Sequence, residues 1–396
     1  MLRLFLFLSA LVVAGCTTAP PPSPPSPEPV AVPAPPLART PIVTPADFEA
    51  LPGWRAAAMA PGVTAFARSC GVIVKRPDEA LLSNAAPWAG TIADWRRTCE
   101  AMTSIVDEAS ARTMMEILFR PVEIIVPEGK PRFTGYFEPS IEASAVPVGA
   151  FTAPVPGPPD DLVQIGGKPH QRLQNGSTQP YPPRAKISPQ NILGYAHPAD
   201  VFFLQIQGSG RLIFPDGRTI RAAYHAHNGQ PFRSTANWLM RSGKITRGEA
   251  SMQGIRAWMD RVSPSEATEA MNANPRYVFF EARPEGDPAL GPNGAQGVPL
   301  TPFGSLAVDT DLHPLGIPMF VQTTAPGLGG DWSGLMIAQD TGGAINGPVR
   351  GDIYFGTGDE AGQRAGTMNA PGRKWVLLPR SVAAALQRAD GAAPST

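Results

Sequence analysis

Proline and glycine set the strongest constraint on how this chain can fold, because 47 prolines and 40 glycines are spread over 396 residues. Proline interrupts helix interiors and central strands, and glycine weakens both while permitting tight turns. Long helical patterns are few, and many short apolar runs are bounded by turn residues. The composition therefore predicts a mainly β fold with helices attached.

The first residues have the form of a secretory signal, in which Arg3 precedes an apolar run over residues 4–13. This run is too short for a permanent transmembrane helix. The residues Val13-Ala14-Gly15-Cys16 resemble a bacterial lipobox, which implies that residues 1–15 are removed and that Cys16 carries the lipid. The alternative is an ordinary cleavage site followed by an unrelated cysteine.

The residues after Cys16 bear on localisation. Position 17 is Thr17 and not aspartate, which resembles the default outer-membrane address of Gram-negative lipoproteins. We therefore expect a protein held by a lipid at Cys16 on the periplasmic face of the outer membrane. Residues 16–44 are rich in proline, alanine and serine, so they have too little apolar surface to fold and should form an extended tether.

About 350 residues remain after the tether, enough for two domains with cores of their own. Lysine plus arginine and aspartate plus glutamate each number 33, and this balance argues against nucleic acid as a partner. The predicted tether and lipid make the membrane surface a partner instead.

Cys70 and Cys99 are the two cysteines outside the signal region, and an exported chain meets an oxidising compartment. Trp95, Cys99 and Met102 fall on one face of a predicted helix that Thr91 and Asp94 could cap, so Cys99 should point inward. The two cysteines either form a disulfide or remain separate buried thiols.

Helices are expected mainly before residue 120 and between about 235 and 272. One helix start is well marked, because Ser263 supplies an N-cap, Pro264 an N1 proline and Glu266 a capping-box partner. Residues 215–217 form a predicted turn. The strand-like runs are residues 201–207, 211–214, 218–221, 277–280 and 375–378.

Five further segments, residues 133–139, 205–210, 306–309, 338–345 and 351–356, combine apolar residues with glycine or aspartate. Asp309, Asp340 and Asp352 lie in three of them beside β-type apolar residues. A carboxylate buried there needs hydrogen bonds or a shifted pKa. The glycines either let backbone approach a ligand closely or simply turn the strands.

In this order the motifs resemble the membrane-bound lytic murein transglycosylase A family, whose C-terminal domain is named for three aspartates. The resemblance runs from about residue 46 to 380, through FTGYFEP, QIQGSG, NPRYVFF, VPLTPFGSLAVD, AQDTGGAI and GDIYFGTGDEAGQRAG. It implies a six-stranded double-psi β-barrel with N-terminal helices in residues 45–138 and 236–390. It also implies a smaller β-domain inserted at residues 139–235, with a groove between the two. The proline- and glycine-rich segments 144–170 and 284–297 depart from the family pattern.

The resemblance further implies cleavage of peptidoglycan glycan strands between N-acetylmuramic acid and N-acetylglucosamine, with no water consumed and 1,6-anhydro ends formed. Asp352 then acts as acid and base, and Asp340 and Asp309 complete the aspartate set. The implied glycan contacts are Thr134, Tyr136, Gln207 and Ser209. The glycan strands are the expected partner, with other cell-wall enzymes as further candidates. For Asp309 and Asp340 the alternative is backbone hydrogen bonding inside the barrel, and for Tyr136 it is a core position.

One carboxyl group suffices for such chemistry. Ordinary glycosidases use two, but here the 6-hydroxyl of the muramic acid attacks intramolecularly, with a high effective molarity. Asp352 would first donate a proton and then accept one. Its pKa must therefore lie above the usual value of about 3.9, which burial and a neighbouring Asp340 should achieve.

The motifs allow two other readings. Asp340-Thr341-Gly342 is an aspartic protease triplet, but a bilobal protease needs a second one and the chain has none. The other reading is a lipoprotein that binds glycan without cleaving it. This alternative stays open, because the same residues of the groove would serve binding and cleavage. The five histidines form no HExxH motif, so no metal site and no cofactor are predicted; His225 and His227 are expected to be polar strand surface.

Overall fold

The structure is a computed structural model that describes residues 42–102, 107–125 and 131–391. The predicted signal segment 1–15, the lipid-attachment residue Cys16 and the tether as far as residue 41 lie outside the described residues. The prediction that the tether extends to residue 44 is wrong, because residues 42–44 belong to a strand that pairs with residues 123–125. Within the described ranges, no helix combines the length and the apolar character needed to cross a bilayer.

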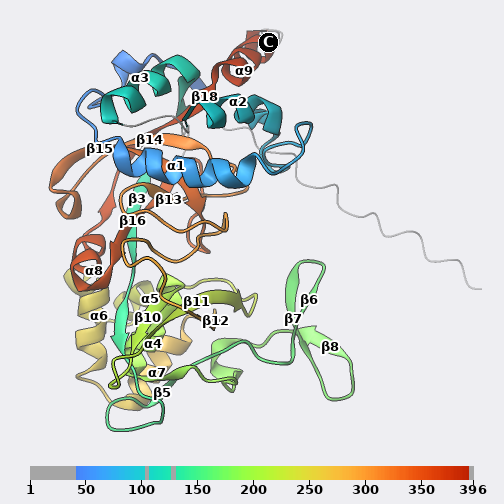
Figure 1. Ribbon diagram of the computed structural model, residues 1–396. Coiled ribbons are helices and arrows are strands. Elements are labelled where there is room, and N and C mark those ends of the chain that lie inside the picture. Colours follow the sequence, from blue (N-terminus) through green and yellow to red (C-terminus); the bar gives the residue numbers. More distant parts are fainter. Residues whose placement is uncertain (1–41, 103–106, 126–130, 392–396) are drawn as a thin grey trace, which may run out of the picture. The chain divides into compact units, whose positions relative to one another are not determined.

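Nine strands form the largest sheet, in the order β1-β2-β18-β14-β15-β13-β16-β3-β17 (Figure 1). Their bounds are β1 Ile42–Pro45, β2 Phe119–Ile125, β3 Arg132–Glu138, β13 Ser305–Ala307, β14 Pro318–Ala325, β15 Gly330–Asp340, β16 Arg350–Thr357, β17 Asn369–Ala370 and β18 Gly372–Pro379. β17 pairs with β3, and Pro371 leads directly into β18, which pairs with β14. The strands β3, β16, β13, β15, β14 and β18 thus belong to one sheet, and its curvature brings β18 against β3, since a Cβ on Gly372 would lie 2.8 Å from the ring of Phe133.

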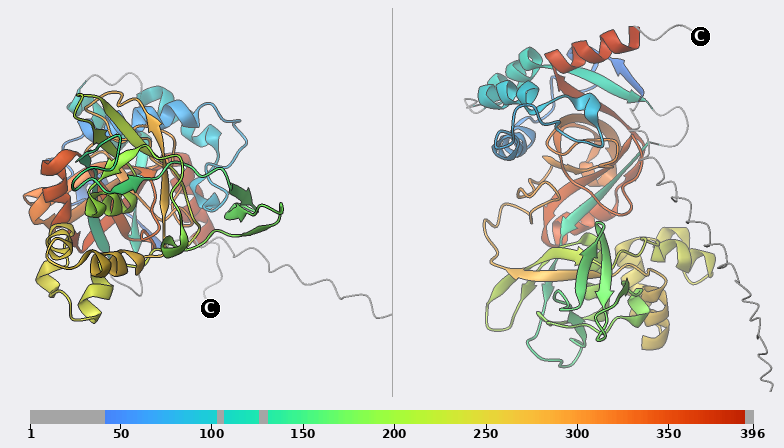
Figure 2. Two further views of the ribbon diagram at one scale, coloured as in Figure 1. Left: turned by 90° about the horizontal axis from the view of Figure 1, so that it is seen from below. Right: turned by 90° about the vertical axis from the view of Figure 1, so that its right-hand side faces the viewer.

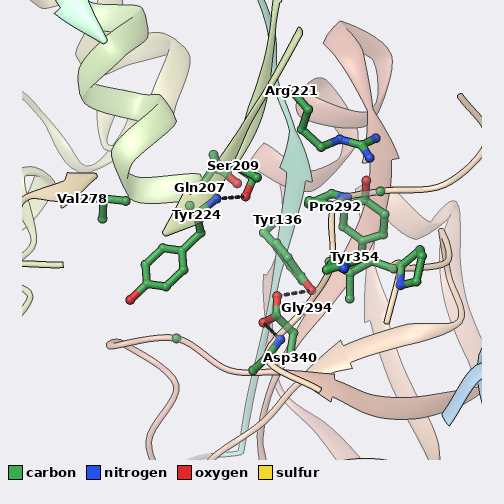
Figure 3. A pocket seen from close by; sticks show the side chains of 18 of the residues that line it. Tyr136, Gln207, Ser209, Arg221, Tyr224, Val278, Pro292, Gly294, Asp340 and Tyr354 are labelled. Atoms are coloured by element: carbon green, nitrogen blue, oxygen red, sulfur yellow. Dashed lines mark hydrogen bonds between the residues drawn. The ribbon is translucent and has the colours of Figure 1, made fainter. Parts of the chain in front are cut away.

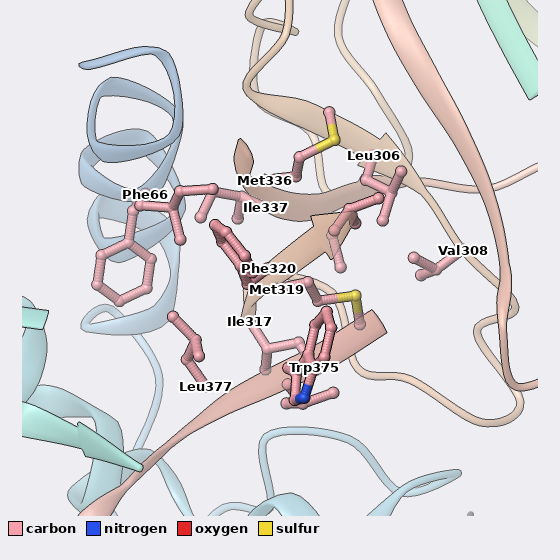
Figure 4. Packing of buried hydrophobic residues seen from close by; sticks show 14 of the residues in the cluster. Phe66, Leu306, Val308, Ile317, Met319, Phe320, Met336, Ile337, Trp375 and Leu377 are labelled. Atoms are coloured by element: carbon pink, nitrogen blue, oxygen red, sulfur yellow. The ribbon is translucent and has the colours of Figure 1, made fainter. Parts of the chain in front are cut away.

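Helices α1 (Ala60–Ile73), α2 (Ile92–Met102), α3 (Glu108–Leu118) and α9 (Arg380–Gly391) pack around this sheet. Phe66 of α1 joins Phe320, Ile337 and Leu377 in a fully buried core (Figure 4). Each such side chain contributes about 1.5–3 kcal/mol by leaving water. Gly62 permits the close approach of α1 to β15, because a Cβ there would lie 2.3 Å from the carbonyl oxygen of Leu335.

The N-terminal helices are joined by a disulfide between Cys70 of α1 and Cys99 of α2, with 5.2 Å between their Cα atoms. Trp95, Cys99 and Met102 are all buried, so the predicted inward face of α2 is confirmed. The predicted cap is also present, since Asp94 accepts hydrogen bonds from both the backbone amide and the hydroxyl of Thr91.

A smaller sheet of four strands has the order β12-β11-β10-β4 and a separate apolar core. Its strands are β4 Ser140–Glu142, β10 Gly210–Ile213, β11 Thr219–His227 and β12 Val278–Arg283. Helices α4 (Pro198–Gln207), α5 (Thr235–Arg241), α6 (Met252–Met259) and α7 (Pro264–Asn272) form a further cluster beside it (Figure 2). This sheet ends at Arg283, whereas the sequence analysis placed the end of the insertion at residue 235.

The remaining elements are short. They are β5 Ala153–Val155, β6 Leu162–Ile165, β7 Lys168–Arg172, β8 Thr178–Pro180, β9 Gly194–Ala196, α8 Gly358–Gly366, and the 3₁₀ helices η1 Phe48–Ala50, η2 Pro87–Ala89, η3 Arg184–Lys186, η4 Arg247–Glu249 and η5 Pro326–Leu328. β5 pairs with β9, and β6, β7 and β8 form a three-stranded sheet.

The predicted strand at residues 201–207 is wrong, because these residues form most of helix α4. His197 caps the helix, Pro198 occupies its first turn, and Gly208 ends it with a left-handed φ of 92°. Residues 201–205 are all buried, so no polar face reveals the helical period.

Two other local predictions are confirmed. Residues 215–217 do form a turn, in which Gly217 has a φ of 82° between β10 and β11. Helix α7 begins with Pro264 after its N-cap Ser263, whose hydroxyl accepts the amide hydrogen of Glu266.

The disulfide gives a first testable prediction. Replacing both Cys70 and Cys99 with alanine should lower the free energy of unfolding by about 3–4 kcal/mol, because the unfolded chain regains the entropy of an open loop of 29 residues. Urea unfolding under non-reducing and reducing conditions measures this. A reductant should destabilise the natural protein and leave the double variant unchanged; equal midpoints for both proteins without reductant would contradict the prediction.

Candidate active site

A cavity of about 850 Å³ lies between the barrel strands and the smaller sheet. Tyr136 of β3, Asp340 at the end of β15 and Tyr354 of β16 line one side, and Ser209 and Tyr224 line the other (Figure 3). Segment 284–300 supplies much of the remaining wall. The cavity therefore combines strand ends of the barrel with the inserted sheet, as expected for the groove.

Asp352 lies on β16, opposite Thr134 of the parallel neighbour β3. The hydroxyl of Thr134 donates a hydrogen bond of 2.6 Å to Oδ1 of Asp352 and accepts one of 2.8 Å from Nη2 of Arg350. Burial raises the pKa of Asp352 to about 6, with a further increase from Asp340, whereas Arg350 and Thr134 lower it. Asp352 is therefore close to half protonated at mildly acidic pH.

Thr134 and Asp352 are not among the residues that line the cavity. Tyr136 is, and it lies two residues after Thr134, on the same face of β3. Tyr354 on β16 pairs in register with Tyr136, and their ring centroids are 5.2 Å apart. Asp352 is thus connected to the cavity wall through the paired strands.

Asp340 has hydrogen bonds on both carboxyl oxygens. Oδ1 accepts from the backbone amides of Thr341 (2.9 Å) and Ala295 (3.0 Å), and Oδ2 accepts from the hydroxyl of Tyr136 (2.9 Å). Burial raises the pKa of Asp340, and these hydrogen bonds act in the opposite direction. The residue therefore fastens segment 284–300 to the barrel.

Asp309 binds backbone amides and does not line the cavity. Oδ2 accepts from Gly347 at 2.7 Å and Oδ1 from Asp311 at 3.1 Å. Behind it lies the buried Lys374, whose Nζ is 3.0 Å from Nε2 of His313. Burial lowers the pKa of Lys374 to about 7, while Asp309 raises it. No sequence pattern predicted a role for this lysine.

The two predicted contacts from the inserted part, Gln207 and Ser209, both line the cavity. Oε1 of Gln207 accepts the amide hydrogen of Phe137 at 3.2 Å, and Oγ of Ser209 accepts that of Tyr224 at 2.9 Å. These bonds tie the end of α4 to strands β3 and β11. Tyr224, which the sequence analysis did not select, has 44% of its surface exposed.

A buried ionic cluster joins the barrel to the smaller sheet. Glu138, at the end of β3, has a fully buried side chain and binds Arg221 at 2.6 Å and Arg211 at 3.1 Å. Thr357 of β16 donates a further hydrogen bond of 3.0 Å to it. The guanidinium groups of both arginines also donate to the carbonyl oxygen of Leu290, so the cluster fixes the cavity wall as well.

Few sequence patterns point to the site residues that were not predicted. Arg350 directly precedes the Gly351-Asp352 motif, and Glu138 lies within FTGYFEP, so both were in view. Arg211 and Arg221 lie in strands whose pairing the sequence does not reveal. Within the described residues, no three histidine, cysteine or acidic side chains are grouped as metal ligands.

The ionic cluster gives the second prediction. Glu138→Gln should destabilise the protein by about 3–5 kcal/mol, because the buried guanidinium group of Arg221 loses its carboxylate partner and that of Arg211 keeps only Glu285. Glu49→Gln is the matched control, since its ion pair with Arg55 is exposed and should contribute little. Chemical unfolding of both variants measures the difference, and equal stabilities would refute a dominant role for the cluster.

Two family models match the chain: the MltA specific insert domain over residues 132–281 and the 3D domain over residues 304–378. The chain is 34% identical over 262 residues to membrane-bound lytic murein transglycosylase A of Escherichia coli strain K12. It is 32% identical over 258 residues to the protein of the same name from Vibrio cholerae. Each match covers 63% of this chain and 66% of the relative, just under two thirds of its length.

Solved structures give the same result over a larger part of the chain. A membrane-bound lytic murein transglycosylase from Agrobacterium tumefaciens is 30% identical with a TM-score of 0.74, covering 86% of this chain and 99% of that one. MltA from Neisseria gonorrhoeae is 29% identical with a TM-score of 0.70, covering 86% and 97%. E. coli MltA with bound chitohexaose is 28% identical with a TM-score of 0.60, covering 80% and 90%. The chain therefore belongs to the membrane-bound lytic murein transglycosylase A family.

Proposed function

We propose that this protein is a lytic transglycosylase that cleaves the β-1,4 bond between N-acetylmuramic acid and N-acetylglucosamine in peptidoglycan, with Asp352 as its acid and base. The observation that carries the proposal is the carboxyl group of Asp352, whose pKa of about 6 suits an acid that must also act as a base. The chitohexaose bound to the similar E. coli protein supports a glycan as the ligand.

In the proposed reaction, protonated Asp352 donates its proton to the glycosidic oxygen as the bond from that oxygen to the anomeric carbon breaks. The carboxylate then accepts the proton of the muramic acid 6-hydroxyl. That oxygen attacks the anomeric carbon and closes a 1,6-anhydro ring. The proton given to the leaving oxygen is replaced by the proton of the 6-hydroxyl, so Asp352 is regenerated and no water is consumed. The intramolecular attack benefits from a high effective molarity.

The hydrogen bonds favour Asp352 over Asp340 as the acid. Among the described residues, Oδ2 of Asp352 accepts no hydrogen bond, so this oxygen is free to carry a transferable proton. Both oxygens of Asp340 are already occupied. Thr134 and Arg350 would stabilise the carboxylate of Asp352 after it has donated, while burial favours the protonated form before.

The walls of the cavity support a role in holding sugars. Tyr224 offers a half-exposed ring on which a sugar face can pack, and Gln207 and Ser209 line the same cavity. We assign substrate binding to these residues and to Tyr136, and a supporting role to Thr134 through its hydrogen bond to Asp352. Asp340 and Asp309 hold the surrounding backbone in place.

The third prediction concerns Asp352→Asn. The variant keeps the shape and the acceptor for Thr134 but has no proton to transfer, so turnover should fall by about three orders of magnitude or more while glycan binding survives. Asp340→Asn is the contrast, because it should lower thermal stability together with activity. Mass spectrometry of 1,6-anhydro products from purified peptidoglycan measures turnover. Near-normal turnover by the Asp352 variant would make Asp340 the leading candidate.

The difference in stability between this variant and the natural protein should depend on pH. The pKa of Asp352 is raised from 3.8 to about 6, so its contribution to stability is present below pH 3.8 and is lost as the pH rises to 6. Asp352→Asn should therefore be more stable than the natural protein at pH 7, by up to about 3 kcal/mol, and equal to it near pH 4. A stability difference that does not vary with pH would argue against the raised pKa.

We also propose that a lipid on Cys16 attaches the protein to the outer membrane. The similar proteins of E. coli and V. cholerae are named membrane-bound, and the lipobox-like residues before Cys16 support this form of attachment. A proline-rich tether would let the catalytic part reach the glycan strands.

The fourth prediction tests the anchor. Cys16→Ala should move the protein from the membrane fraction to the soluble periplasmic fraction with its specific activity unchanged, because the described residues that line the cavity all lie at position 136 or later and the proposal gives Cys16 only the role of lipid attachment. Fractionation of cells and anhydro-product assays measure both properties. A soluble but inactive variant would contradict the proposal that residues 16–41 act only as a tether.

A further inference from the structure

Arg276 lines the cavity on the side of the inserted part, between α7 and β12. Across the cavity lies Gly343, in the loop that follows Asp340. A Cβ on Gly343 would be 3.3 Å from both Cζ and Nη1 of Arg276, so the guanidinium group lies against this barrel loop. It is therefore placed where the inserted sheet and the barrel face each other.

The charge of Arg276 has no carboxylate partner among the described residues. The two other arginines that line the cavity are already paired, Arg221 with Glu138 and Arg283 with Glu281. The side chain of Arg276 makes one long hydrogen bond, from Nη1 to the carbonyl oxygen of Gln230 at 3.5 Å. Most of its five N–H donors are thus available to a ligand.

The surroundings of Arg276 make this unpaired charge costly. Burial lowers its pKa from the usual 12.5, and it is half-buried beside Tyr224 and His227. Burial, together with the charge of Arg276, also lowers the pKa of His227 to about 4, so the histidine is neutral at physiological pH. An uncompensated, partly desolvated cation is unfavourable unless a ligand supplies the opposite charge.

The expected substrate carries such a charge. A glycan made only of N-acetylglucosamine has neutral hydroxyl and acetamido groups, whereas each muramic acid adds a lactyl side chain. This side chain ends in a carboxylate when it is bare and continues into an acidic peptide when it is substituted. The planar guanidinium fork matches a carboxylate with two parallel hydrogen bonds.

We propose that Arg276 is a specificity-determining residue that binds a carboxylate on the muramic acid side chain of the glycan. This inference rests on the proposed function, because it assigns the substrate class of the same cavity. The contact with Arg276 distinguishes peptidoglycan strands from neutral β-1,4-linked glycans, which would bind the cavity walls without contacting Arg276.

The experiment measures affinity in the full-length Asp352→Asn protein, which should bind without turnover. Calorimetry would compare four ligands: chitohexaose, a peptidoglycan glycan oligomer stripped of peptide, the same oligomer with its lactyl carboxylates methyl-esterified, and an oligomer that retains its peptide stems. Adding Arg276→Gln should raise the Kd of carboxylate-bearing oligomers by about tenfold, the loss expected for a charge-assisted hydrogen bond. The Kd values of chitohexaose and the ester should stay within about twofold.

Two further variants separate charge from packing. Arg276→Lys keeps the charge and should recover part of the lost affinity. Arg283→Gln removes a cavity cation that already has a carboxylate partner, so it should not change the ratio of the Kd values for acidic and neutral ligands. Melting temperatures establish that each variant is folded.

The outcomes are distinct. If Arg276→Gln weakens the binding of stripped oligomers, Arg276 binds the lactyl carboxylate. If it weakens only the binding of oligomers with peptide stems, Arg276 binds a carboxylate of the stem. Both results support the proposal. An equal loss of affinity for chitohexaose, or no loss of affinity for any ligand, overturns the proposal. Failure of the natural protein to form anhydro products would instead overturn the proposed function, since the binding series does not depend on turnover.

Discussion

The arrangement of the site depends on the ion pairs that Glu138 forms with Arg211 and Arg221. The Glu138 carboxylate is fully buried, and it joins the end of β3 to two arginines of the smaller sheet and to Thr357 of β16. The same strand carries Thr134 and Tyr136 earlier in its course. A single segment of seven residues thus contacts the proposed acid, forms part of the cavity wall and fixes the junction between the two sheets.

The three aspartates differ in their hydrogen-bond partners. Asp309 and Asp340 are bound by backbone amides, which hold them as connectors of loops. Asp352 receives one hydrogen bond, from Thr134, and burial raises its pKa to about 6; burial also raises the pKa of Asp340, where three hydrogen bonds act in the opposite direction. The chemistry proposed for the site therefore follows from how few hydrogen bonds one carboxyl group receives.

The sequence predicted those features that depend on neighbours along the chain. Caps at Asp94 and Ser263, the turn before Arg218 and the inward face of α2 all follow from local patterns, and each is present. Helix α4 was misassigned because residues 201–205 are all buried and show no helical period. The partners of Glu138 and the isolation of Arg276 were not predictable, since both depend on strand pairings distant in the sequence.

The parallel pairing of β16 with β3 sets Asp352 opposite Thr134 and Tyr354 opposite Tyr136 through a backbone ladder. Much of the remaining wall, by contrast, comes from segment 284–300, which contains no helix or strand. The proposed acid and this part of the wall therefore belong to different parts of the chain. Exchange of that segment between relatives offers a way to redesign which glycans are accepted while the acid and its hydrogen-bond partner keep their geometry.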